Sequence, residues 1–159
     1  MPGLPPLIEE DVLSLDLALD GLLRKSEAAA VMLIDKGGPV IARRGETEQF
    51  DITTIAALAA GSFCATQAIA ERLGEANFTS IYQQGERLSL LFCNVDENVL
   101  LIVIFNAALS AGAVKYYAAE TIRQVAQQLE RAGRRAPGQT LDLVSENVLD
   151  VSTIFSKKR

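Results

Sequence analysis

The sequence predicts an α+β domain of the α/β-sandwich type, in which a five-stranded, mostly antiparallel sheet carries helices on both faces. Three observations support this fold class. Apolar residues recur at helical spacing in several segments, shorter apolar runs have the length of strands, and the order of elements is α-β-β-α-β-β-β-α. The length of 159 residues suits one domain followed by a tail.

Each element follows from its own side-chain pattern. Helices are assigned where apolar residues recur every three or four positions, and strands where short apolar runs end at polar turns. A flexible leader at residues 1–8 precedes the first helix. The expected elements are a helix at 9–25, hairpin strands at 28–35 and 39–42, a helix at 52–73, strands at 77–84, 88–94 and 99–105, and a helix at 111–132.

Turn and capping residues mark the element ends. Asp51 suits the N-cap of the second long helix, Gly74 its C-terminal cap, and Ser110 the N-cap of the last helix. A Gly-bearing turn joins the two hairpin strands. Residues 43–45, Arg-Arg-Gly, are expected to begin a polar loop after the hairpin.

The strands differ in their expected place in the sheet. Residues 99–105, VLLIVIF, are apolar at every position, as expected for a central strand covered on both faces. Residues 77–84 place Phe78 and Ile81 among polar neighbours. That mixed pattern favours a strand at the sheet edge.

Charge and composition exclude several classes of function. The net charge is −5 and the body of the chain has no basic cluster, so no nucleic-acid partner is expected. The longest apolar runs have strand length, and the N-terminus lacks the pattern of a signal peptide. We therefore expect no membrane insertion and a cytoplasmic location, with Cys64 and Cys93 reduced.

Catalytic patterns are missing from the sequence. It contains no histidine, no P-loop and no nucleophile elbow, and its acidic residues are scattered over expected surfaces. Two cysteines without histidine do not make an ordinary zinc site. We expect no active site of its own, no metal and no cofactor.

The second long helix is rich in small residues, and a helical wheel at about 100° per residue divides it into two stripes. The stripe with four large aliphatic side chains is expected to face the sheet: Ile55, Leu58, Ser62, Thr66, Ile69 and Leu73. On the opposite side lies a stripe of small residues, called here the small stripe: Ala57, Gly61, Cys64 and Ala68.

The small stripe has two interpretations. Alanine is a good helix former on any exposed face, which explains Ala57 and Ala68. It does not explain Gly61, because glycine costs roughly 1 kcal/mol relative to alanine inside a helix. We therefore favour an interaction surface that another backbone approaches closely. A second copy would pack helix on helix while the edge strand pairs with its mate through Phe78, Ile81 and Gln83; a different protein would dock on the paired helices.

The C-terminal region, residues 133–159, changes character. A basic, Gly- and Pro-bearing linker leads to SENVLDVSTIF, whose apolar residues recur at helical spacing. The pattern favours a docking segment formed by Val148, Leu149, Val151, Ile154 and Phe155. The alternatives are a disordered terminus or a helix folded back onto the domain.

Several segments together resemble the roadblock/dynein light chain family, and most of all its bacterial MglB-type polarity regulators. They are VMLIDKGGPVIARRG, FDITTIAALAAGSFCATQAIAERLGE, YQQGERLSLLF and VLLIVIFN, within a roadblock-like domain at 9–132. The resemblance implies a roadblock-like (profilin-like) fold and a homodimer with a continuous ten-stranded sheet.

The resemblance also implies a function. Such proteins bind a small Ras-like GTPase (MglA-type) on their paired second helices and stimulate GTP hydrolysis without donating an arginine, in cell polarity or motility. The small stripe would be the contact, and the tail would touch the same GTPase and tune nucleotide exchange. The main alternative is a non-catalytic scaffold or adaptor in a motor or signalling complex; a small-molecule sensor is a weaker one.

Overall fold

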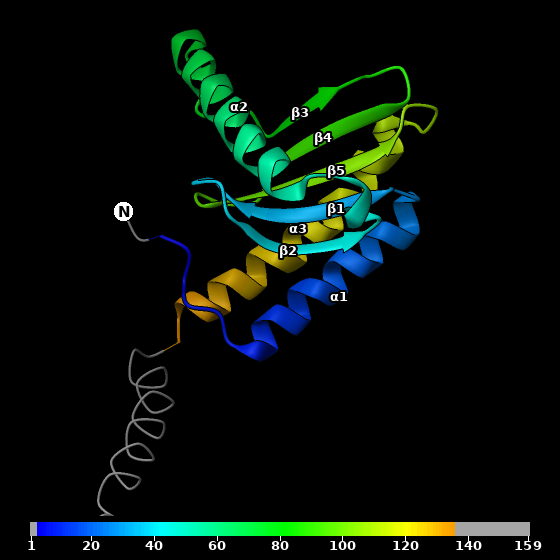
Figure 1. The fold of residues 1–159 in the computed structure, drawn as a ribbon. Coiled ribbons are helices and arrows are strands. Elements are labelled where there is room, and N and C mark those ends of the chain that lie inside the picture. The colour runs from blue at the N-terminus through cyan, green and yellow to red at the C-terminus, as the bar shows by residue number, and fades with distance from the viewer. Residues whose placement is uncertain (1–2, 136–159) are drawn as a thin grey trace, which may run out of the picture.

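A computed structural model of the chain describes residues 3–135 (Figure 1). The element order is the predicted α-β-β-α-β-β-β-α, with one short 3-10 turn, η1, before the second helix. The bounds are α1 Glu9–Ser26, β1 Ala30–Asp35, β2 Val40–Gly45, η1 Thr47–Gln49, α2 Ile52–Leu73, β3 Ser80–Gln83, β4 Leu88–Asn94, β5 Val99–Asn106 and α3 Ala111–Gly133.

The strands form one sheet in the order β2-β1-β5-β4-β3. Every neighbouring pair is antiparallel, so the sheet is more regular than the mostly antiparallel one expected. β5 is central, and its residues 99–105 are buried on both faces, which confirms the interpretation of VLLIVIF. β3 lies at an edge, as its mixed pattern predicted, but the expected bounds of 77–84 were wrong, because the strand covers only Ser80–Gln83 and Phe78 precedes it.

The expected end of the hairpin was wrong. Arg43 and Arg44 are not loop residues but continue β2 to Gly45, where they pair with β1. Two arginines are tolerated there because β2 is the other edge strand and Arg44 forms ion pairs with Asp16 and Asp20 of α1. The strand ends at Gly45, whose φ of +94° is a conformation that favours glycine.

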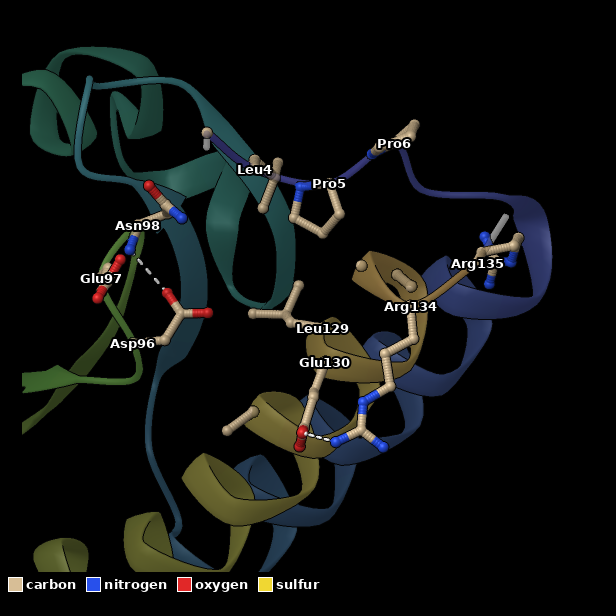
Figure 2. Close-up of a pocket in the computed structure, with 14 residues that line it drawn as sticks. Leu4, Pro5, Pro6, Asp96, Glu97, Asn98, Leu129, Glu130, Arg134 and Arg135 are labelled. Carbon is tan, nitrogen blue, oxygen red and sulfur yellow. Dashed lines mark hydrogen bonds and ion pairs between the residues drawn. The ribbon is translucent and has the colours of Figure 1, made fainter. Parts of the chain in front are cut away.

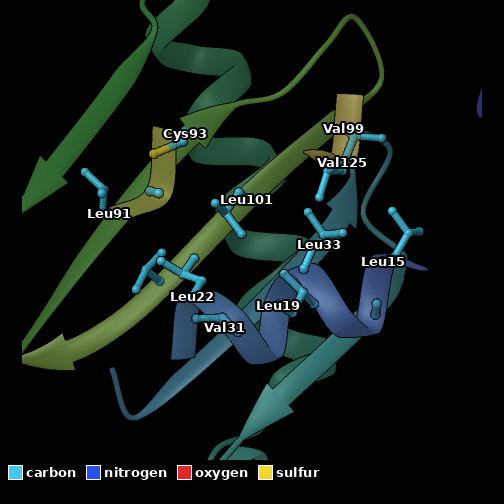
Figure 3. Close-up of a cluster of buried hydrophobic side chains, with 14 of the residues drawn as sticks. Leu15, Leu19, Leu22, Val31, Leu33, Leu91, Cys93, Val99, Leu101 and Val125 are labelled. Carbon is cyan, nitrogen blue, oxygen red and sulfur yellow. The ribbon is translucent and has the colours of Figure 1, made fainter. Parts of the chain in front are cut away.

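The sheet divides the core into two layers. α1 and α3 cover one face, and α2 covers the other (Figure 1). Alternate residues of each central strand enter different layers: Leu33 packs with α1 and α3, whereas Met32 and Ile34 pack with α2. Figure 3 shows the first layer, in which Leu19 and Leu22 of α1 lie with side chains of the sheet.

A buried ion pair ties the start of α1 to the end of α3. The Asp11 carboxylate accepts hydrogen bonds from Arg135 at 2.8 and 2.9 Å, from Gln128 Nε2 at 2.7 Å and from the Ile8 N–H at 2.8 Å. The Arg135 guanidinium lowers the pKa of Asp11 to about 2. The pair therefore fixes the point at which the chain leaves α3.

Candidate protein-interaction site

The ends of α2 are set by the two predicted caps. Asp51 Oδ1 accepts from the Thr54 N–H at 3.3 Å, and hydrogen bonds from Thr54 hold the pKa of Asp51 below its usual value. Gly74 closes the helix at φ +78°, and its N–H donates to carbonyl groups of the last turn. The helix therefore begins and ends where the sequence predicted.

The predicted orientation of α2 was wrong. The buried side chains of α2 are small, apart from one isoleucine and one phenylalanine, and all but the last of them belong to the cluster with the sheet: Ile52, Ala56, Ala59, Ala60, Phe63 and Ala70. Three residues of the stripe expected to face the sheet are exposed instead, Leu58 by 69%, Ile69 by 56% and Leu73 by 68%. Its other members, Ile55, Ser62 and Thr66, are half-buried.

The physical reason for the error is the size of the inward residues. A helical wheel with the largest aliphatic residues against the sheet gives an orientation of α2 about its axis that differs from the observed one by roughly 100°. Small residues at Ala56, Ala59 and Ala60 let the α2 backbone lie close to the sheet, and Phe63 fills the remaining space. The signal that sequence reasoning missed is this alanine series, spaced three or four residues from Ile52 and Phe63.

The small stripe lies on the outside of the domain. Ala57, Gly61, Cys64 and Ala68 are all exposed. A Cβ added at Gly61 would meet no atom within 4 Å, so nothing in the described domain explains why this position is glycine. The role of the four residues in binding stays a prediction.

The small stripe and the exposed aliphatics make α2 an open apolar helix. Among the described residues, α2 is the one helix with the length and composition of a membrane span, and 28% of its most apolar window is buried. A single helix of this kind is weak evidence for membrane insertion, and one side of α2 packs on the sheet. The exposed apolar area is a candidate surface for contact with another protein.

The β1–β2 turn borders the small stripe. Lys36 reaches from this turn to α2, with its ammonium nitrogen 5.3 Å from the centre of the Phe63 ring. The same Nζ donates to the Asp96 carbonyl oxygen at 2.6 Å, and burial lowers the pKa of Lys36. Lys36 therefore joins α2 to the β4–β5 turn and holds the rim of the surface in place.

The expected dimer residues lie beside the C-terminal half of α2. Within residues 3–135, β3 pairs with β4 on one side and leaves its other side open. The Phe78 N–H donates to Gln67 Oε1 of α2 at 3.4 Å, Ile81 packs in the α2 layer, and Gln83 is exposed. The segment before β3 is therefore joined to α2 by this hydrogen bond, and Ile81 of β3 packs in the same layer.

The other predicted site residues fall elsewhere. Val148, Leu149, Val151, Ile154 and Phe155 of the expected docking segment lie outside the described residues.

Cys93 is buried in β4, which raises the pKa of its thiol to about 11. Residues 3–135 contain no group of three or more Cys, Asp or Glu side chains placed to hold a metal ion.

A five-stranded antiparallel sheet with two helices on one face and one open apolar helix on the other defines the class of fold, a three-layer α+β domain. The Roadblock/LC7 domain model matches residues 14–105, more than half of the chain, and the chain belongs to this family. No curated protein matches the sequence significantly.

Solved structures of roadblock-type proteins also match this chain. MglB of Myxococcus xanthus is 28% identical, with a TM-score of 0.77 over 82% of this chain and 98% of that one. The gliding protein MglB of Thermus thermophilus is 30% identical, with a TM-score of 0.76 over 82% and 99%. Profilin II of Acanthamoeba castellanii shares the fold at 15% identity, with a TM-score of 0.54 over 71% and 97%. The chain is thus a roadblock-domain protein of the MglB type.

Proposed function

We propose that this protein is a homodimeric regulator that binds a small Ras-like GTPase and stimulates its GTP hydrolysis, with no active site of its own. The observation that carries the proposal is the open apolar face of α2, where Leu58, Ile69 and Leu73 stand exposed beside the small stripe. The likeness to MglB over most of the chain supports it.

The dimer uses the open edge of the sheet. Two β3 strands pair through their free sides, so that two five-stranded sheets form one of ten strands, with Phe78, Ile81 and Gln83 at the junction. Ile69 and Leu73 pack against the second α2 helix, which removes their apolar area from water.

The GTPase sits on the paired α2 helices. Small side chains at Ala57, Gly61, Cys64 and Ala68 let its backbone approach the helices closely. The regulator acts by reshaping the GTPase so that the GTPase's own groups align. Arg72, beside the stripe, donates to the Ala68 carbonyl oxygen at 3.3 Å, and we assign it a surface role rather than that of an arginine finger.

The tail gives a second contact in this scheme. Residues 148–155 touch the same GTPase and tune nucleotide exchange, and the complex works in the cytoplasm in cell polarity or motility. The alternative function is a non-catalytic scaffold or adaptor, with which the match to the Roadblock/LC7 domain is equally compatible.

GTP turnover separates the two functions. The rate of phosphate release by an MglA-type GTPase from the same genome is measured with and without this chain. The proposal expects acceleration that saturates with added dimer. Binding without any acceleration supports the scaffold, and absence of both overturns the GTPase partnership.

A double substitution tests the contact itself. Cys64→Arg plus Ala68→Arg places two long charged side chains on the small stripe, and we expect GTPase binding to weaken about 100-fold or more. Because both positions are exposed, circular dichroism and the melting temperature should change little. The matched control is Ala119→Arg plus Gln124→Arg on α3, which adds the same charge at exposed positions and should bind normally.

A further inference from the structure

A groove of about 900 Å³ lies at one end of the domain, and no residue of α2 lines it. Its walls are the segment before α1, the C-terminal end of α3 and the turn between β4 and β5 (Figure 2). It is therefore separate from the surface to which the proposed function is assigned.

The middle of the groove is apolar. Leu4 and Pro5 form one wall, and Ala126 and Leu129 of α3 form the other. Leu129 belongs to the core between α3 and the sheet, and Leu4 packs against that core from outside. Leu129 is itself only 3% exposed, so an occupant with two or three apolar side chains would remove from water mainly the area of Leu4, Pro5 and Ala126, which are half-buried.

The two ends of the groove carry different charged side chains, and both arginines at one end have an acidic partner. Arg134 and Arg135 lie at one end, and Asp96 and Glu97 lie at the other, with Leu129 between them (Figure 2). Arg134 pairs with Glu130 at the surface, and Arg135 pairs with Asp11. A segment with acidic residues first and basic residues last would match this polarity.

The chain itself supplies such a segment. The described chain ends at Arg135, a lining residue held in place by Asp11, so residue 136 begins at the basic end of the groove. Residues 148–155 carry apolar side chains at helical spacing, preceded by Glu146 and followed by Lys157, Lys158 and Arg159. Residues 136–147 span up to about 40 Å when extended, more than enough to reach the groove.

We propose that residues 148–155 bind in cis to the groove of their own domain. Val151 and Phe155 pack between Leu4 and Leu129, with Glu146 and Asp150 toward Arg134. Lys157 and Lys158 lie toward Asp96 and Glu97. While the segment occupies the groove it is not free to contact another protein. The inference concerns one chain alone, so it stands or fails independently of the GTPase.

A spin label tests the contact in the full chain. Ser156→Cys in a Cys64→Ser background carries a nitroxide, since Cys93 is buried. We expect loss of the backbone amide signals of Leu4, Ala126 and Gly133 in the nuclear magnetic resonance spectrum, and their recovery when the label is reduced. Unchanged signals at all three positions overturn the proposal.

Matched variants test which part of the tail binds. Val151→Asp plus Phe155→Asp should restore the groove signals, whereas Leu141→Asp plus Leu143→Asp, the same change in another part of the tail, should not. Arg134→Glu should weaken the effect and Asp150→Arg should restore it in the double variant. The reverse pattern, in which the 141–143 variant alone releases the groove, overturns the assignment.

A mixed sample separates binding in cis from binding by a second copy. Isotope-labelled chain without nitroxide is mixed with nitroxide-labelled chain at natural isotope abundance. The proposal expects no signal loss in the groove of the isotope-labelled chain. Signal loss there in proportion to the share of nitroxide-labelled chain in the mixture would make a second copy the occupant and overturn binding in cis.

Discussion

The two faces of the sheet are built in opposite ways. On the α1 and α3 side, Leu15, Leu19 and Leu22 are at most 1% exposed, and an ion pair between Asp11 and Arg135 closes the helix ends. On the α2 side, the helix meets the sheet mostly through alanines and leaves its large aliphatic residues in solvent. The same sheet is therefore packed by large leucines on one face and mostly by alanines on the other.

The domain divides its large apolar residues between its own core and an exposed helix face. Burial stabilises by about 25 cal/mol per Å² of apolar area, so the large leucines of α1 stabilise the single domain. The exposed aliphatics of α2 gain this stabilisation only when another chain covers them. α1 also exposes Leu13 by 56% and Leu17 by 70%, so the comparison needs a test on both faces.

The largest expected effect compares two leucines, one on each face. Leu19→Ala leaves a cavity in the core and should lower the free energy of unfolding by about 2–5 kcal/mol. Leu58→Ala, at an exposed position, should change it by less than about 0.5 kcal/mol. Urea unfolding at two protein concentrations measures both, because dissociation of a dimer would make the midpoint depend on concentration. Equal costs would remove the distinction between the faces.

A smaller effect concerns the buried ion pair. The pKa of Asp11 is about 2 in the folded chain against 3.8 for a free side chain, so its ionisation stabilises the fold above about pH 4 and this contribution disappears as pH falls through about 2. Asp11→Asn should cost about 1–2 kcal/mol at pH 7, since Arg135 still reaches solvent. It should also flatten the acid limb of the stability profile. Glu10→Gln, an exposed neighbour, is the control, and an Asn variant with an unchanged acid limb would contradict the assignment.

The smallest effect compares two helix glycines. A Cβ meets nothing within 4 Å at Gly61 of α2 or at Gly21 of α1. Each change to alanine should therefore stabilise the chain by about 0.5–1 kcal/mol. Only Gly61→Ala adds a methyl group to the small stripe, so only it should weaken binding of the GTPase. If both variants bind equally well, Gly61 is not a contact residue.

Much of the fold could be predicted from the sequence because its signals are local. The caps at Asp51, Gly74 and Ser110 depend on a few neighbouring residues, and the central strand follows from one apolar run. The orientation of α2, in contrast, did not depend on local signals in the sequence. The inward side of the helix was decided by how closely the helix approaches the sheet, and placing the largest residues inward gave an orientation rotated by roughly 100°.

The remaining differences between the expected and the observed structure depend on contacts between residues that are distant in sequence. β2 continues through Arg44 because Asp16 and Asp20 of α1 lie beside it. The pair between Asp11 and Arg135 joins residues at opposite ends of the domain. At the candidate site, the small stripe was found from its composition, whereas the exposure of Leu58, Ile69 and Leu73 required the structure.

The central claim is that the α2 face is the association surface, and sedimentation velocity tests it most directly. Three chains are compared: the native one, Ile69→Arg plus Leu73→Arg on α2, and Leu13→Arg plus Leu17→Arg on α1. All four substituted positions are exposed, so each chain should fold. The account predicts a dimer for the native chain and for the α1 variant, and a monomer for the α2 variant. A dimeric α2 variant, or dissociation of the α1 variant alone, would contradict it.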